Sequence, residues 1–97
     1  MDIPNLTSIL AIADQAIKLH EAGQRRKEAQ LQLGFAYNAW KNKHSIEHVD
    51  RDTLDWTRMM VATKAPFDAL EKAKRAERYA RGRLAVAVTR HQKGGAA

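Results

Sequence analysis

Residues 28–41 read EAQLQLGFAYNAWK, and this stretch decides how the rest of the chain must pack. At about 100° per residue, its apolar side chains fall on two sides of a helix. One stripe consists of Ala29, Leu33, Ala36, Tyr37 and Trp40. Leu31 and Phe35, four residues apart, form a second apolar face on the opposite side. Because a helix that is apolar on two sides needs a partner on each, we expect residues 28–41 to form the centre of the core and a candidate homodimer interface.

The segment before this stretch also has a helical pattern. Residues Leu6–His20 predict an amphipathic helix with one broad apolar face, and Asn5 or Thr7 is expected to cap its start. Gly23 is then followed by residues 24–27, a full turn without an apolar side chain. The helix either bends there or continues through it as a solvated collar.

Two further helices are predicted after the polar connection at residues 41–52. The first runs from Thr53 to about Lys64, with Asp50 or Asp52 as its cap. Pro66 either kinks this helix or starts the next one. Residues 67–91 predict the last helix. Its narrow apolar stripe consists of Leu70, Ala73, Ala76, Ala80, Leu84, Ala87, Val88 and His91.

The fold class expected from these patterns is all-α. Gly and Pro together number only seven, five and two, in 97 residues, which disfavours a sandwich or barrel. We expect three or four antiparallel helices in a helical bundle, with residues 1–93 as one domain and residues 94–97 as a disordered tail. Since a chain of this size buries only about 60–65% of its unfolded surface, self-association is also expected. Glu77 at the border of the apolar stripe interrupts a heptad, which favours ordinary helix packing over a long coiled coil.

Several classes of protein are excluded by composition. The chain has no cysteine, and therefore no disulfide and no thiolate ligand or nucleophile. Asp2 stands where a signal peptide needs positive charge. The apolar stretch from Ile9 to Ala13 is far shorter than the ~20 residues that span a bilayer. We therefore expect a cytoplasmic protein without a membrane partner.

Positive charge is concentrated in the last third of the chain. Residues 1–63 contain eight Lys and Arg and eight Asp and Glu, so they carry no net charge. Residues 64–97 contain nine Lys and Arg against three acids, which accounts for the whole net charge of +6. Such a separation attracts polyanions, although Lys and Arg on a helix also form a merely solvated face.

The leading functional expectation is a non-enzymatic binding protein whose last helix engages an anionic partner, a nucleic acid or a nucleotide. Arginine suits bidentate contact with phosphate, and Tyr79 lies among the cations where it could stack on a base. The candidate anion-binding residues are Lys74, Arg75, Arg78, Arg81 and Arg83, with a second cluster at Arg25, Arg26 and Lys27. Neither a helix-turn-helix nor an RNA-binding signature is present, so contact with the phosphate backbone is favoured over base reading.

The alternative is an inhibitor or adaptor that docks a helix face onto another protein. Its candidate interface residues are Leu31, Phe35, Tyr37, Trp40, Trp56 and Met59. The short, basic chain without a cofactor motif resembles the small helical accessory proteins of phages and other mobile elements. That resemblance implies action on a host protein or host machine.

One motif is typical of an enzyme. Residues 44–48, HSIEH, match the H-x-x-E-H pattern of zinc peptidases, in which both histidines bind zinc from one helical face. Here Ser45 has the character of a helix cap, which would place His44 outside the helix. A surface metal site at His44, His48 and Asp52 is a further alternative to a solvated linker. We expect no catalytic residues, no metal and no cofactor.

Overall fold

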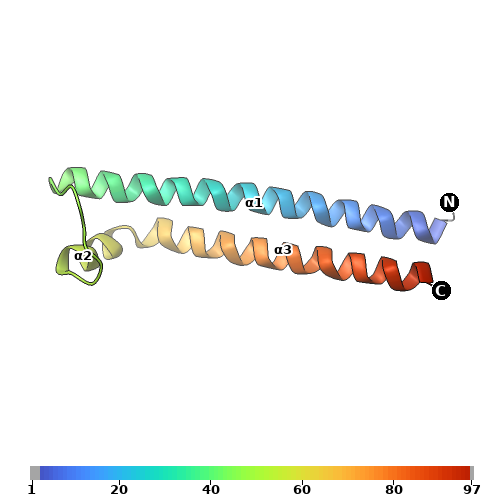
Figure 1. The fold of residues 1–97 in the computed structure, drawn as a ribbon. Helices are drawn as coiled ribbons and strands as arrows, with labels where there is room; N and C mark the ends of the chain where they lie inside the picture. Colours follow the sequence, from blue (N-terminus) through green and yellow to red (C-terminus); the bar gives the residue numbers. More distant parts are fainter. Residues whose placement is uncertain (1–2, 97) are drawn as a thin grey trace.

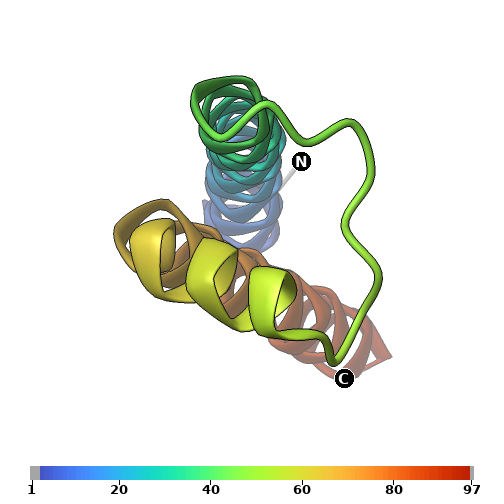
Figure 2. The ribbon, with the colours of Figure 1, turned by 90° about the vertical axis from the view of Figure 1, so that its left-hand side faces the viewer.

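The computed structural model is an elongated helical hairpin (Figure 1). It describes residues 3–96, and the side chains of all of these except Pro4, Gly95 and Ala96. Helix α1 spans Ile3–Lys43, helix α2 spans Leu54–Ala62 and helix α3 spans Lys64–Ala96. The two long helices run antiparallel, with both chain ends at one end of the hairpin, and α2 lies across the other end (Figures 1 and 2).

The hairpin is much more extended than a compact domain of the same length. Its dimensions are 65 × 19 × 17 Å, and its radius of gyration is 20.4 Å. A compact chain of 97 residues has a radius of gyration of about 12.5 Å. The all-α expectation is therefore confirmed for residues 3–96, but the chain shows two long packed helices and one short one instead of a bundle.

The first two predicted helices are one continuous helix of 41 residues. The turn at residues 24–27 continues the helix because its side chains are good helix formers, with Arg26 half-buried and the other three residues exposed. A carboxylate one turn earlier supports this region, with Glu21 Oε2 4.0 Å from Arg25 Nη2. Thr7 lies inside the helix, where its hydroxyl donates to the Ile3 carbonyl, so Thr7 is not a cap.

The N-cap of helix α2 is Thr53, not Asp50 or Asp52 as predicted. The Thr53 hydroxyl accepts a hydrogen bond from the Trp56 amide at 3.2 Å, which satisfies one of the free amides of the first turn. Asp52 instead adopts a left-handed backbone with φ 65°, which redirects the chain into α2. Asp50 contributes its carbonyl, which accepts from the Thr53 hydroxyl at 2.7 Å.

Pro66 lies in the first turn of α3, so it starts this helix rather than kinking a longer one. Its missing amide removes no helical hydrogen bond there, because the amides of a first turn have no partner within the helix. The Phe67 amide is the next to donate, to the Thr63 carbonyl at 3.1 Å. At the other end α3 extends to Ala96. Ala97, Met1 and Asp2 lie outside the described residues.

The two long helices meet along a seam that repeats every three and four residues on both of them. The seam residues of α1 are Ser8, Ile12, Gln15, Leu19, Ala22, Arg26, Ala29, Leu33, Ala36 and Trp40. Those of α3 are Leu70, Ala73, Glu77, Ala80, Leu84, Ala87 and His91. All are buried or half-buried, and the spacing is that of a coiled coil. The prediction of ordinary helix packing is therefore wrong.

Two polar contacts cross this seam, which is otherwise apolar except for Gln15. Arg26 Nε donates to Glu77 Oε1 at 3.0 Å, with the two side chains only 27% and 15% exposed. Near the open end, Ser8 Oγ and His91 Nδ1 lie 2.5 Å apart. Glu77 thus occupies a seam position because Arg26 of the opposite helix neutralises it. Since a slip of one heptad would separate the Arg26 guanidinium from the Glu77 carboxylate, this layer favours the observed register of the hairpin.

The buried apolar residues larger than alanine lie toward the closed end, near α2. Leu33, Leu70 and Met59 are 7%, 5% and 8% exposed. Thr63, at the junction of α2 and α3, is buried, and its hydroxyl donates to the Met59 carbonyl at 2.7 Å. Residues 28–41 therefore contribute to the core as expected, but on their Leu33 face only.

The glycines inside the long helices offer a test of this packing. Gly34 and Gly82 have open space where a Cβ would be, so Gly34→Ala and Gly82→Ala are each expected to raise the free energy of unfolding by about 0.5–1 kcal/mol. A Cβ on Gly23 would lie 3.0 Å from the Glu77 carboxylate, so Gly23→Ala is expected to gain less or to destabilise. Urea denaturation of the three variants measures the difference. Equal gains at all three positions would contradict the close packing of Gly23 against Glu77.

Candidate anion-binding groove

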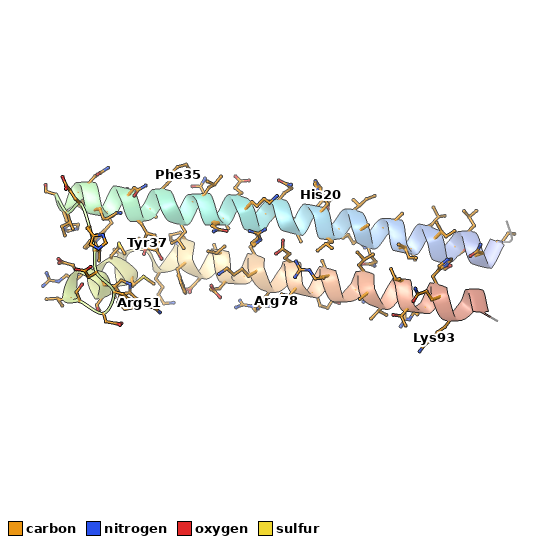
Figure 3. All side chains as sticks on the ribbon, in the orientation of Figure 1. His20, Phe35, Tyr37, Arg51, Arg78 and Lys93 are labelled. Carbon is orange, nitrogen blue, oxygen red and sulfur yellow. The ribbon has the colours of Figure 1, made fainter. Side chains whose placement is uncertain are left out.

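The cations predicted on α3 do not share one surface. Lys74 and Arg81 each lie near a carboxylate, Lys74 Nζ 3.4 Å from Glu71 and Arg81 Nη2 3.8 Å from Glu77. Arg78 points away from α1 (Figure 3), and within residues 3–96 it forms no ion pair. Arg83 differs from all of these because it borders α1. Of the five cations predicted on this helix, Arg83 alone lines the groove described below.

The predicted second cluster, residues 25–27, is divided by the geometry of α1. Arg26 belongs to the seam and is committed to Glu77, so its guanidinium is a structural group rather than a free contact. Lys27 is exposed. Arg25 points to the same side of the hairpin as Arg83, and both line one hollow.

A groove follows one side of the hairpin between α1 and α3. It consists of two adjoining hollows of about 490 and 330 Å³, which share Gln15 and Arg83. Lys18 and Arg25 line it from α1, and Arg83 and Arg90 line it from α3. Among the described residues, no carboxylate lines either hollow. The groove is therefore a cationic channel with a floor of small seam residues.

The spacing of these cations follows from the seam. Lys18 and Arg25 are seven residues apart, as are Arg83 and Arg90. In a seam with a heptad repeat, residues seven apart lie on the same side, about 10.5 Å along the helix. Because Arg26 lies opposite Glu77 and Ser8 opposite His91, Lys18 lies opposite Arg83, and Arg25 and Arg90 lie about two turns further along the groove in opposite directions.

Tyr79 adds an aromatic surface to this groove. It lines the inner hollow and is 68% exposed. The Arg83 guanidinium lies over the Tyr79 ring at 5.9 Å from its centroid, and Arg83 Nη1 donates to the Tyr79 hydroxyl at 3.5 Å. A guanidinium and a ring held together in this way present a charge and a stacking face to the same ligand.

The cations of the groove are only weakly neutralised within the chain. Lys18 pairs with Asp14 and Arg25 with Glu21, but in both pairs the side chains are more than half exposed. Exposed pairs of this kind contribute about 0–1 kcal/mol, so a phosphate can replace the carboxylate at little cost. Within the described part of the chain, Arg90 takes part in no ion pair.

Lys18 and Arg90 were not among the residues predicted from the sequence. The signal that could have identified them is the seven-residue spacing, Lys18 to Arg25 and Arg83 to Arg90, which places each pair on one flank of a heptad seam. Because Glu77 interrupts the apolar pattern, the heptad seam was not identified from the sequence. The prediction was based instead on the density of charge along residues 72–83.

The residues proposed as a protein interface separate into two groups. Leu31 and Phe35 are each 61% exposed, and Phe35 points away from α3 (Figure 3). Tyr37 points between the helices (Figure 3), donates to Met60 Sδ at 3.6 Å, and has its pKa raised above 10.0 by burial. Trp40 and Trp56 are half-buried, and Met59 is buried inside the chain's own core. The second group therefore already packs within the protein.

The H-x-x-E-H segment lies outside the helices. His44 follows the last turn of α1 and packs its ring 4.4 Å from that of Trp40, whereas His48 lies 2.8 Å from Asp50. The two histidines therefore do not share a helical face. In residues 3–96 no three His, Asp or Glu side chains gather closely enough to hold a metal ion, so the site expected as an alternative at His44, His48 and Asp52 is not formed.

Comparison with protein families, curated proteins and solved structures gives no match to this chain. None of the helices in residues 3–96 has an apolar stretch that could cross a bilayer.

Proposed function

We propose that this protein is a non-enzymatic binding module that holds a nucleic acid in the cationic groove between α1 and α3. The observation that carries this proposal is the alignment of Lys18, Arg25, Arg83 and Arg90 along one groove that no carboxylate within residues 3–96 lines. A row of cations fits a polymer with regularly repeated phosphates better than it fits a single small anion. We place this activity in the cytoplasm.

Single-stranded nucleic acid suits the groove better than a duplex. Stacking on an exposed aromatic ring requires a base that is free of its partner strand, and Tyr79 is the aromatic side chain that lines the groove. Tyr79 and Arg83 together would hold one base and one phosphate. Because every base has a stacking face, we expect little sequence preference.

The salt dependence of binding to a single-stranded oligonucleotide tests the proposal. If the four cations neutralise four phosphates and the counterions of those phosphates are released, log K is expected to fall against log salt with a slope of about −3. Fluorescence anisotropy of a labelled oligothymidine at several salt concentrations gives this slope. A slope near zero, or no binding at low salt, would contradict the groove as a site for nucleic acid.

A second candidate function is supported by the exposed apolar side chains of α1. Leu31 and Phe35 are both 61% exposed, which suits an adaptor that docks a helix face onto another protein. Affinity for such a partner would tolerate salt and would fall when one of these side chains is truncated. The salt dependence of partner binding therefore distinguishes the two functions.

A further inference from the structure

The outer face of α1, on the side away from α3, has no partner within the chain. Its large apolar side chains are between 44% and 78% exposed: Ile3, Leu6, Leu10, Ile17, Leu31 and Phe35. His20 and Phe35 point away from α3 (Figure 3), which places this face opposite the seam. The strip extends from residue 3 to residue 35, about 48 Å of helix, and exposed polar side chains such as Gln24 interrupt it between Ile17 and Leu31.

The accessible surface area of the chain is larger than that of a compact monomer of the same mass. The accessible surface is 7366 Å², whereas a compact monomer of 10.9 kDa has about 5,600 Å². The excess is about 1,800 Å². A stable interface buries about 800 Å² on each partner, so one partner along the outer face of α1 would remove close to half of this excess.

We propose that a second copy of this chain docks antiparallel on the outer face of α1. The positions of the apolar residues fit such a symmetric contact. The pairs Leu6/Phe35 and Leu10/Leu31 have the same midpoint, between residues 20 and 21. A two-fold axis at that midpoint brings Leu10 of one copy near the partner's Leu31, and Leu6 near the partner's Phe35, so both ends of the strip are covered at once.

Charge also favours the antiparallel orientation. About the same midpoint, Asp14 lies at the level of the partner's Lys27. A parallel dimer in register would instead bring Lys27 to the level of the partner's Lys27, whereas Arg25 and Arg26 face α3 in either orientation. Since like charges across an interface are unfavourable, the antiparallel orientation is preferred.

This orientation has a consequence for the grooves, and that consequence rests on the proposed function. The two-fold axis of an antiparallel pair is perpendicular to the plane that contains both α1 helices, so rotation about it does not exchange the two faces of the assembly. The four long helices then form a layer in the order α3, α1, α1, α3, with both cationic grooves on the same face. One nucleic acid strand, or two neighbouring strands, could contact both grooves, which raises the effective affinity.

The mass of the protein in solution tests the docking without any nucleic acid. Sedimentation equilibrium is expected to give twice 10.9 kDa for the wild type. Leu10→Asp and Leu31→Asp are expected to shift the mass to that of the monomer. Val61→Asp, at a residue of α2 that is 73% exposed and outside the strip, serves as the matched control and is expected to remain dimeric. Circular dichroism on each variant checks that the helices are kept. A wild type that stays monomeric up to about 200 µM would overturn the proposal.

Cysteine cross-linking tests the orientation, because the chain has no cysteine of its own. A mixture of Leu10→Cys and Leu31→Cys chains is expected to form a disulfide-linked dimer under mild oxidation. Leu10→Cys alone is expected to stay largely uncross-linked. Efficient cross-linking of Leu10→Cys with itself, with no disulfide between Leu10→Cys and Leu31→Cys chains in the mixture, would show a parallel dimer and overturn the antiparallel docking. These outcomes do not depend on nucleic acid, so failure of the docking and failure of the proposed function are distinguishable.

Discussion

Reversing the charge of Arg83 and Arg90 together is expected to weaken binding of a single-stranded oligonucleotide about a hundredfold. Hydrogen bonds to charged groups contribute about 1.5–3 kcal/mol each, and two phosphate contacts are lost in Arg83→Glu/Arg90→Glu. The slope of log K against log salt is also expected to become shallower by about 1.4, because counterions are released from two fewer phosphates. Both quantities come from anisotropy titrations with the same labelled oligothymidine.

The matched control reverses two arginines on the outer side of α3. Arg75→Glu/Arg78→Glu changes the net charge by the same amount, but neither residue lines the groove. We expect it to weaken binding less than tenfold, through the general field of the protein alone. If the two double variants lose the same affinity, the ligand responds to net charge rather than to the groove, and the proposed site is wrong.

Removing the Glu77 carboxylate is expected to lower the free energy of unfolding by about 2 kcal/mol. Glu77→Ala leaves the Arg26 guanidinium, only 27% exposed, in the seam without its partner. Breaking a fully buried pair costs about 3–5 kcal/mol, and partial exposure of this pair reduces that cost. Urea denaturation followed by circular dichroism measures the change. Glu71→Ala is the control, because the Glu71–Lys74 pair is more exposed and should change stability by less than about 0.5 kcal/mol.

A double replacement separates stability from register. Arg26→Leu/Glu77→Leu keeps the seam apolar and is expected to be at least as stable as the wild type, since it removes the cost of dehydrating two charges. It also removes the layer that favours the observed alignment of the two helices. If Glu77→Ala is as stable as the wild type, Arg26 and Glu77 do not interact in the folded protein as the structure places them.

The helical character of the chain could be predicted from its sequence, but the arrangement of the helices could not. The all-α class could be predicted from the low number of Gly and Pro residues and from the helical spacing of apolar side chains in residues 6–41. The sequence left open whether α1 bends or continues at residues 24–27, because they contain no apolar side chain; helix propensity and the ion pair of Arg25 with Glu21 carry the helix through them. The seam was not predicted because a charged Glu77 is tolerated there only when Arg26 neutralises it, and Arg26 is 51 residues away in the sequence.

The candidate site was predictable in kind rather than in position. The excess of cations in residues 64–93 drew attention to α3, but charge density does not show which side of a helix borders another helix. Arg83 and Arg25 were predicted and line the groove, whereas Lys18 and Arg90 were recognised only once the antiparallel alignment was known. The seven-residue spacing within each pair becomes informative when the heptad seam has been identified.

The most direct test of the groove is to follow the backbone amide resonances of the ¹⁵N-labelled protein while a short oligothymidine is added. The proposed function predicts that the largest shifts gather at Lys18, Arg25, Tyr79, Arg83 and Arg90, from two helices that share this groove. Shifts confined to the outer side of α3 around Arg75 and Arg78, or no shifts at low salt, would contradict it.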